Sequence, residues 1–197
     1  PGRFSLTQTT LFAPRRPRGN PPSAHRTAHP THRRFSRRPS GPISWVLVRV
    51  MLIVNPFATA TTAAGRDALV HTLESRFTVD VEHTTHRGHA SELGAAAVAA
   101  GHDAVLVHGG DGTVNETVNG MLGAPADFTT RPQPQLGVIP GGSANVFAST
   151  FGVNADPLTA TRQHIELLET GQHRSIGLGH TADRWFLFNT GMGMDAI

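Results

Sequence analysis

Three glycines and an aspartate at positions 109–112 form the stretch whose residue types best suit chemistry. An apolar run at 104–108 enters this stretch, and a helix-compatible segment beginning at Thr113 leaves it. Glycine lets the backbone approach a ligand closely or take a positive φ, and the first amides of a helix have no partner within it. Gly109, Gly110, Gly112 and Thr113 therefore predict a phosphate-binding loop.

Asp111 lies within this loop, where its carboxylate would repel a phosphate unless a cation separated them. Mg²⁺ prefers hard oxygen ligands and commonly binds one or two carboxylates together with substrate phosphates. The chain contains no Lys, so its seventeen basic side chains are all Arg. A Walker-type loop, which needs Lys, is excluded. We predict that Asp111 is catalytic and organises Mg²⁺, directly or indirectly; the alternative is a helix cap.

A second glycine turn, at residues 140–145, follows the apolar run at 136–139. It contains Gly142, Ser143 and Asn145. Ser143 does not fit a nucleophile elbow, because Asn145 stands where that motif requires Gly. We favour a turn whose polar groups bind a ligand.

Two other patterns indicate chemistry less strongly. His83, His86 and His89 are spaced three residues apart, but a zinc site needs a complete ligand geometry, and this loop lacks Cys or carboxylate partners. We therefore favour an absence of metal there. Residues 191–196 are close to a dinucleotide fingerprint, but the given sequence ends before a helix could confirm it.

Strands and helices are predicted to alternate from residue 45 onward. Strands are expected at 45–54, 78–82, 104–108 and 136–139, and helices at 63–77, 90–100, 157–169 and the segment carrying Asn115 and Glu116. This alternation predicts an α/β fold with a helix-covered, mostly parallel sheet. Short strands at 175–178 and 185–190 predict a hairpin that begins a β-rich second domain. The expected domains are therefore 46–172, which carries the glycine turns, and a truncated 173–197.

The N-terminal region differs sharply in composition from the rest. Residues 1–50 hold ten Arg and no acidic residue, so the remaining seven Arg and fourteen acids give −7, although the whole chain carries +3. Residues 1–45 are rich in Pro and Arg and are predicted to be disordered. A basic arm for nucleic acid or anionic lipid is one interpretation. We favour another, in which the segment is not native and translation starts at Val48 or Met51.

Composition also limits the class of protein. The chain has no Cys, which excludes disulfides and thiolate metal sites and is compatible with a reducing cytoplasm. No apolar run approaches the roughly 18 residues needed to span a bilayer. We expect no transmembrane segment.

Three motifs together resemble the diacylglycerol kinase catalytic domain family, which includes bacterial lipid kinases and sphingosine kinases. They are Asn55-Pro56, the block 109–120 and the block 136–145, and the resemblance extends in order over residues 46–197. NAD kinases and phosphofructokinases share the Gly-Gly-Asp-Gly core but not the Asn-Glu and Asn-Gly that follow it here.

The resemblance implies ATP-dependent, Mg²⁺-assisted transfer of a γ-phosphate to a lipid hydroxyl, such as that of diacylglycerol, by a cytoplasmic protein peripheral to the inner membrane face. It places ATP against the residues Asn55, Thr85, Gly109, Gly110, Asp111, Gly112, Thr113, Glu116, Gly142, Ser143 and Asn145. It implies an α/β nucleotide domain of NAD kinase and diacylglycerol kinase type followed by a β-sandwich, with the lipid in the cleft between them. A homodimer is left open.

The chain departs from the family pattern at three places. Phe57 and the residues after it stand where a small Gly is usual, and Val146 replaces an Asp or small residue. The carboxylate expected as general base lies beyond the sequence, so we expect a fragment that is inactive alone. A sphingoid base or another lipid alcohol as acceptor, a non-catalytic nucleotide-binding regulator and nucleic-acid binding through the Arg-rich arm are the alternatives.

Overall fold

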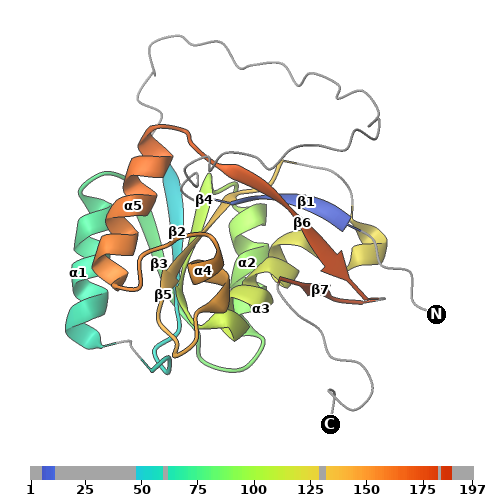
Figure 1. Cartoon of the computed structure of the whole chain (residues 1–197), viewed down its shortest axis with the longest axis horizontal. Coiled ribbons are helices and arrows are strands. Elements are labelled where there is room, and N and C mark those ends of the chain that lie inside the picture. Colours follow the sequence, from blue (N-terminus) through green and yellow to red (C-terminus); the bar gives the residue numbers. More distant parts are fainter. Residues whose placement is uncertain (1–5, 12–47, 60–61, 129–131, 182, 188–197) are drawn as a thin grey trace, which may run out of the picture.

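A single sheet of seven strands organises the chain in the computed structural model, which describes residues 6–11, 48–59, 62–128, 132–181 and 183–187 (Figure 1). The strand order is β3-β2-β4-β5-β1-β6-β7. The strands are β1 (Leu6–Leu11), β2 (Arg49–Val54), β3 (Thr78–His83), β4 (Ala104–Gly109), β5 (Gln135–Pro140), β6 (Arg174–His180) and β7 (Trp185–Phe186). Strands β3, β2, β4 and β5 are mutually parallel, which confirms the predicted mostly parallel α/β sheet.

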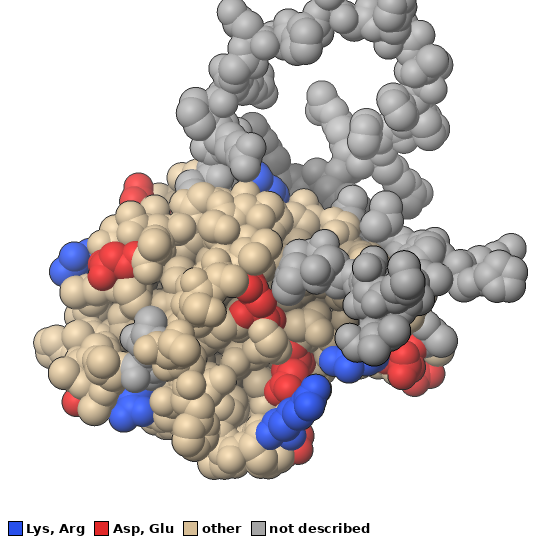
Figure 2. All heavy atoms as spheres, turned by 60° about the horizontal axis from the view of Figure 1, so that its bottom comes forward, with Lys and Arg blue, Asp and Glu red and all other residues tan. Residues whose placement is uncertain are grey.

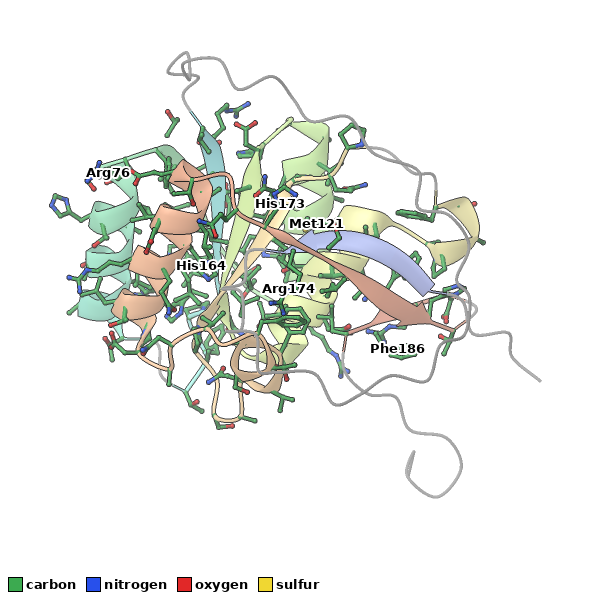
Figure 3. All side chains as sticks on the ribbon, turned by 45° about the horizontal axis from the view of Figure 1, so that its top comes forward. Arg76, Met121, His164, His173, Arg174 and Phe186 are labelled. Atoms are coloured by element: carbon green, nitrogen blue, oxygen red, sulfur yellow. The ribbon has the colours of Figure 1, made fainter. Side chains whose placement is uncertain are left out.

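Helices cover both faces of the parallel strands (Figure 1). One pair is α1 (Ala63–Glu74) with α5 (Pro157–Glu169), and the other is α2 (His89–Ala99) with α3 (Asp111–Leu122). Leu52 of β2 packs with the first pair, and its neighbour Ile53 packs with the second. Burial on both faces explains why these strands are continuous apolar runs. The side chains of Met121 and His164 lie against the sheet from α3 and α5 (Figure 3).

Small residues let α2 and α3 cross at close range. A Cβ added at Gly94 would lie 2.5 Å from the carbonyl oxygen of Thr117, and one at Gly120 would overlap the carbonyl of Ser91. Larger side chains would therefore push the helices apart. The contact fixes the start of α2 beside the middle of α3, where Glu116 lies.

The prediction that residues 1–45 are disordered is wrong for Leu6–Leu11. These residues form β1, which pairs antiparallel with β6 from Leu6–Gly179 to Leu11–Arg174 and parallel with β5 at Leu11–Leu136. The segment contains three Thr between its two Leu, a composition that favours a strand. Averaging it with the Pro- and Arg-rich residues around it hid this preference. The rest of 1–45 lies outside the described residues, and the non-native origin of the segment stays a prediction.

Strands β6 and β7 form the predicted antiparallel hairpin, with Gly179 opposite Phe186. Through β1 they continue the sheet, so the domain boundary at 172/173 stays a prediction. Two short helices were not predicted: α4 (Val146–Thr150) and the 3₁₀ turn η1 (Pro125–Asp127). The residues 191–196 lie outside the described part of the chain. Among the helices that are described, none combines the length and apolarity needed to cross a bilayer.

Candidate functional site

A cleft of about 540 Å³ opens where β2, β4 and β5 end, at the lower end of the sheet in Figure 1. Its walls come from four segments that are far apart in the sequence. The lining residues are Asn55, Phe57, Ala58, Thr59, Thr84, Thr85, His86, Arg87, Ala90, Gly110, Asp111, Gly112, Thr113, Glu116, Gly142, Ser143, Ala144 and Asn145. Every residue predicted to contact ATP is on this surface except Gly109, which is buried at the end of β4. Their individual roles stay predictions.

The first glycine turn delivers the chain directly from β4 into α3. Gly110 is the N-cap residue of α3, with φ −90° and ψ 178°, and no side chain caps this helix end. The first amides of a helix have no partner inside it, and they carry the positive end of the helix dipole. The amides of Gly112 and Thr113 belong to this first turn, and both residues line the cleft. The arrangement suits a bound anion.

The glycines of the two turns serve close packing and not positive φ, which corrects part of the sequence interpretation. The described glycines with positive φ are Gly88, Gly101, Gly123, Gly152 and Gly171, so none belongs to either turn. A Cβ at Gly142 would lie 2.7 Å from the Cα of Gly110, and one at Gly141 would lie 3.0 Å from the Cα of Gly109. Backbone therefore packs on backbone between the turns.

Gly112 differs from the other turn glycines. A Cβ at this position would meet no atom within 4 Å. The residue is exposed in the first turn of α3 and lines the cleft. The absence of a side chain there leaves open space against the helix end.

Asp111 joins the two turns through its carboxylate. Its Oδ2 accepts a hydrogen bond from the amide of Val146 and its Oδ1 accepts one from the amide of Phe147, both at 2.9 Å. Asp111 thus caps α4, a helix 35 residues further along, and leaves the start of its own helix, α3, without a side-chain cap. A carboxylate stabilises a helix N-terminus by satisfying free amides and opposing the dipole.

The position of Asp111 is compatible with a role in binding Mg²⁺. A carboxylate offers about four lone-pair sites, of which the two amides use two. Within the described ranges no group of three or more His, Asp or Glu side chains assembles into a metal site. Mg²⁺ often has few protein ligands and completes its shell with substrate phosphates and water. The residues therefore fit a cation that arrives with a nucleotide, held on the protein side by Asp111.

Asn55 ties the end of β2 to the start of α3. Its Nδ2 donates to Thr113 Oγ1 at 3.0 Å, and its Oδ1 accepts from the amide of Phe57 at 3.0 Å. The amide of Ala58 closes the turn on the carbonyl of Asn55 at 3.2 Å. Asn55 therefore fixes both the mouth of the cleft and the buried side chain of Thr113.

Asn145 shapes the second turn from within. Its Oδ1 accepts from the amide of Gly142 at 2.9 Å, and its Nδ2 donates to the carbonyl of the same residue at 2.6 Å. Its φ of 46° is the one positive value outside glycine in the described part of the chain. Asn tolerates this left-handed conformation better than most residues. The turn therefore presents Ser143 and Ala144 to the cleft.

Glu116 holds the loop that forms the opposite wall. Its Oε2 accepts from the amide of Gly88, the N-cap residue of α2, at 3.0 Å. Gly88 has φ 92°, a conformation that favours glycine. Thr85, in the same loop, donates its amide to His89 Nδ1 at 3.1 Å. Glu116 thus supports the Thr85 loop through backbone.

Within the described ranges, His83, His86 and His89 do not form a group that could hold a metal ion. The rings of His86 and His89 stack with centroids 4.8 Å apart. His86 Nε2 lies 3.4 Å from Glu92 Oε1. His83 ends β3.

A buried histidine that the sequence did not single out lies beneath the two turns. His108 is 2% exposed, and its Nδ1 donates to the carbonyl of Ile139 at 3.3 Å. Burial lowers the pKa of His108, and the positive charge of Arg66 lowers it further. His108 is therefore a neutral support under the cleft.

Charge on this side of the molecule is sparse. Figure 2 brings this side forward and shows a largely uncharged surface with a few Arg and acidic side chains scattered over it. Arg87 is the one Arg on the described lining, beside the two acids Asp111 and Glu116. The sequence analysis did not select Arg87. Most of the neutralisation would fall to amides and a cation.

Comparison with known proteins decides the family. The pattern described as "Diacylglycerol kinase catalytic domain" matches residues 49–180, or 132 of 197 residues. The chain belongs to the diacylglycerol kinase catalytic domain family. The match contains both glycine turns, Asn55 and the Thr85 loop.

Individual relatives agree with this family assignment. The chain is 33% identical over 122 residues to "Probable lipid kinase YegS-like" from Chromohalobacter salexigens, covering 62% of this chain and 37% of that protein. It is 30% identical over 149 residues to "Diacylglycerol kinase" from Bacillus subtilis, covering 74% and 46%. A crystal structure of a diacylglycerol kinase from Bacillus anthracis superposes with a TM-score of 0.53 at 32% identity, covering 60% and 40%. The chain spans less than half the length of these relatives.

Proposed function

We propose that this chain is the nucleotide-binding part of an ATP-dependent lipid kinase. The observation that carries the proposal is the uncapped N-terminus of α3, which faces a cleft together with a positioned carboxylate, Asp111. Phosphoryl transfer depends chiefly on positioning and charge stabilisation, and these groups supply both. Relatives named diacylglycerol kinase and lipid kinase support the same conclusion.

The residues would divide the work on ATP by their chemistry. The amides of Gly112 and Thr113 donate to phosphate oxygens at the positive end of the α3 dipole. The guanidinium of Arg87 supplies a positive charge in the same cleft. Asp111, held by two amides, binds the cation. Mg²⁺, when bound, neutralises charge that develops on the phosphates.

The acceptor would enter beside the nucleotide. A second cleft of about 530 Å³ shares Arg87 and Glu116 with the first and reaches Asp183 and Arg184 of the β6–β7 turn. Two adjoining clefts with common walls suit a reaction between two substrates. Because a lipid acceptor resides in a bilayer, we propose that the protein works at a membrane surface.

Nucleotide binding to the 197-residue chain is the first experiment. Calorimetric titration with ATP is expected to show binding that strengthens when Mg²⁺ is added. A chain that is folded, as judged by circular dichroism, and binds no ATP would contradict the proposal.

Transfer to lipid is the second experiment and uses the complete gene product. Labelled ATP is offered with diacylglycerol, a sphingoid base and a polyprenol in mixed micelles. Phosphorylation of diacylglycerol is the expected result, and labelling of another alcohol would redefine the acceptor. ATP binding without labelling of any lipid would favour a non-catalytic regulator.

A further inference from the structure

Phe57 is an aromatic side chain that the fold leaves uncovered. It is 81% exposed, and the two large apolar residues that stand exposed in the described chain are Phe57 and Val146. Burying a Phe side chain is favourable by roughly 1.5–3 kcal/mol, so an uncovered ring is a position where a binding partner gains free energy.

The local backbone explains why the ring cannot reach the core. Its amide is bound to Asn55 Oδ1 at 3.0 Å, and the next amide, of Ala58, is bound to the Asn55 carbonyl at 3.2 Å. Asn55 is in turn bound to Thr113 of α3. These bonds hold Phe57 at a tight turn outside the sheet.

Phe57 is one of the residues that line the candidate nucleotide cleft. Only Pro56 separates it from Asn55, whose side chain touches the first turn of α3. The phosphate-binding groups and the exposed ring therefore share one cleft. A nucleotide has two parts that match these two features: a charged phosphate chain and a flat apolar base.

The other ring among the lining residues is already occupied on one face. His86 stacks on His89 with an interplanar angle of 10°. Phe57 has no ring contact of that kind among the described residues and presents a carbocyclic face, which suits a purine.

We infer that Phe57 stacks on the base of the bound nucleotide and sets the purine preference of this site. The inference rests on the proposed function, because it assumes that the cleft binds ATP. Stacking contacts the face of the base and not its edge, so ATP and GTP should bind similarly and both more tightly than CTP.

The experiment compares ATP with inorganic tripolyphosphate, which has the phosphate chain but no base. Both are titrated calorimetrically into the 197-residue chain and into Phe57→Ala, Phe57→Leu and Phe57→Trp. One base–aromatic stack predicts a loss of ATP affinity in Phe57→Ala of about fivefold to 150-fold. Tripolyphosphate affinity should not change. Phe57→Leu, which keeps apolar bulk without the ring, should also lose ATP affinity, and Phe57→Trp should retain it.

A spectroscopic signature accompanies the Trp variant. ATP should quench the additional tryptophan fluorescence of Phe57→Trp relative to the wild-type chain, and tripolyphosphate should not. An equal loss of affinity for both ligands would overturn the inference, because it would show that Phe57 supports the turn and does not stack on the base.

Three further outcomes separate this inference from the proposed function. Wild-type chain that binds ATP as tightly as Phe57→Ala does would overturn only the stacking role. Loss of binding to phosphatidylglycerol vesicles in Phe57→Ala, with unchanged ATP affinity, would overturn it in favour of membrane contact. Wild-type chain that binds no ATP would overturn both proposals.

Discussion

The two ends of the parallel sheet differ in what their polar groups bind. At the end where the strands begin, side chains bind one another: Asp80 Oδ2 lies 2.7 Å from His102 Nε2 and 3.3 Å from the guanidinium of Arg49. Asp103 accepts from the amide of Arg49 at 2.9 Å. At the end where the strands finish, glycine turns pack backbone on backbone and a helix end stays uncapped.

The difference indicates which end of the sheet has groups available to bind a ligand. Charged groups at the first end have partners within the protein, and burial of His102 beside a carboxylate ties β3 to the end of α2. The second end holds one carboxylate, Asp111, in a fixed position and leaves amides toward a cleft. We therefore expect substitutions at the first end to affect stability, and substitutions at the second to affect ligands.

The largest effect is expected from Asp111→Asn in the complete gene product. An amide cannot bind the cation as a carboxylate does, so transfer should fall by at least about 100-fold. Its NH₂ group would also face an α4 amide, which costs about 1–3 kcal/mol of stability. A radiometric assay and thermal unfolding measure the two effects. Asp127→Asn, the same change on η1 outside the cleft, is the control. Unchanged turnover in Asp111→Asn would exclude the catalytic role.

A smaller effect, on stability, should distinguish Gly142, which packs against backbone, from Gly112, which faces open space. Gly142→Ala places a Cβ against the backbone of Gly110 and should lower the free energy of unfolding by about 1–3 kcal/mol. Gly112→Ala places its Cβ in open space within a helix and should raise the free energy of unfolding by up to about 1 kcal/mol. Both should weaken ATP binding. Urea unfolding and calorimetry test this pair, and equal stability of the two variants would contradict turn-to-turn packing.

The pH dependence of stability should report the buried histidines. Burial lowers the pKa values of His108 and His164 in the folded chain below the unfolded value of about 6.5. The unfolded chain then binds more protons, so stability is full above about pH 6.5 and falls as the pH drops below it. Each histidine contributes up to about 1.4 kcal/mol per pH unit.

Urea unfolding of the wild-type chain between pH 8 and pH 5 measures this slope. His108→Asn should reduce it, because one of the two groups is removed. A slope that is flat below pH 6.5 would show that the histidines take up protons without unfolding the chain.

The smallest effect is expected at the other end of the sheet. The hydrogen bond from His102 lowers the pKa of Asp80, and Arg49 lowers it further. Asp80→Asn removes the charge that these partners face, so the melting temperature should fall slightly and ATP affinity should stay the same. Differential scanning calorimetry with and without ATP tests both statements. An altered ATP affinity would show that the two ends are coupled.

Local hydrophobic patterns predicted the sheet strands that are buried on both faces and the helices that cover them. Apart from His108, the run at β4 is apolar up to its final Gly, and α1 repeats Leu69 and Leu73 at helical spacing, so their types could be assigned from the sequence. The strand order could not, because it depends on pairings between distant segments. β1 was missed because a Pro- and Arg-rich segment surrounds it in the sequence, and its partners β5 and β6 lie more than a hundred residues away.

The sequence allowed many residues of the site to be predicted, but not the contacts between them. Gly110, Thr113 and Asn145 could be grouped from their motifs, and all three line the cleft. That Asp111 caps α4 could not be foreseen, because a five-residue helix has a weak periodic signal and its cap comes from a residue 35 positions earlier. The exposure of Phe57 likewise follows from a turn held by Asn55.

The central claim is that the N-terminus of α3 binds the phosphates of a nucleotide. Amide chemical shifts of the ¹⁵N-labelled 197-residue chain, recorded while ATP and Mg²⁺ are added, test it most directly. The account predicts that the amides of Gly112, Thr113 and Val146 shift together and saturate, while those of Arg49 and Asp103 do not. Saturating ATP that leaves the α3 amides unshifted, or shifts only the opposite end of the sheet, would contradict it.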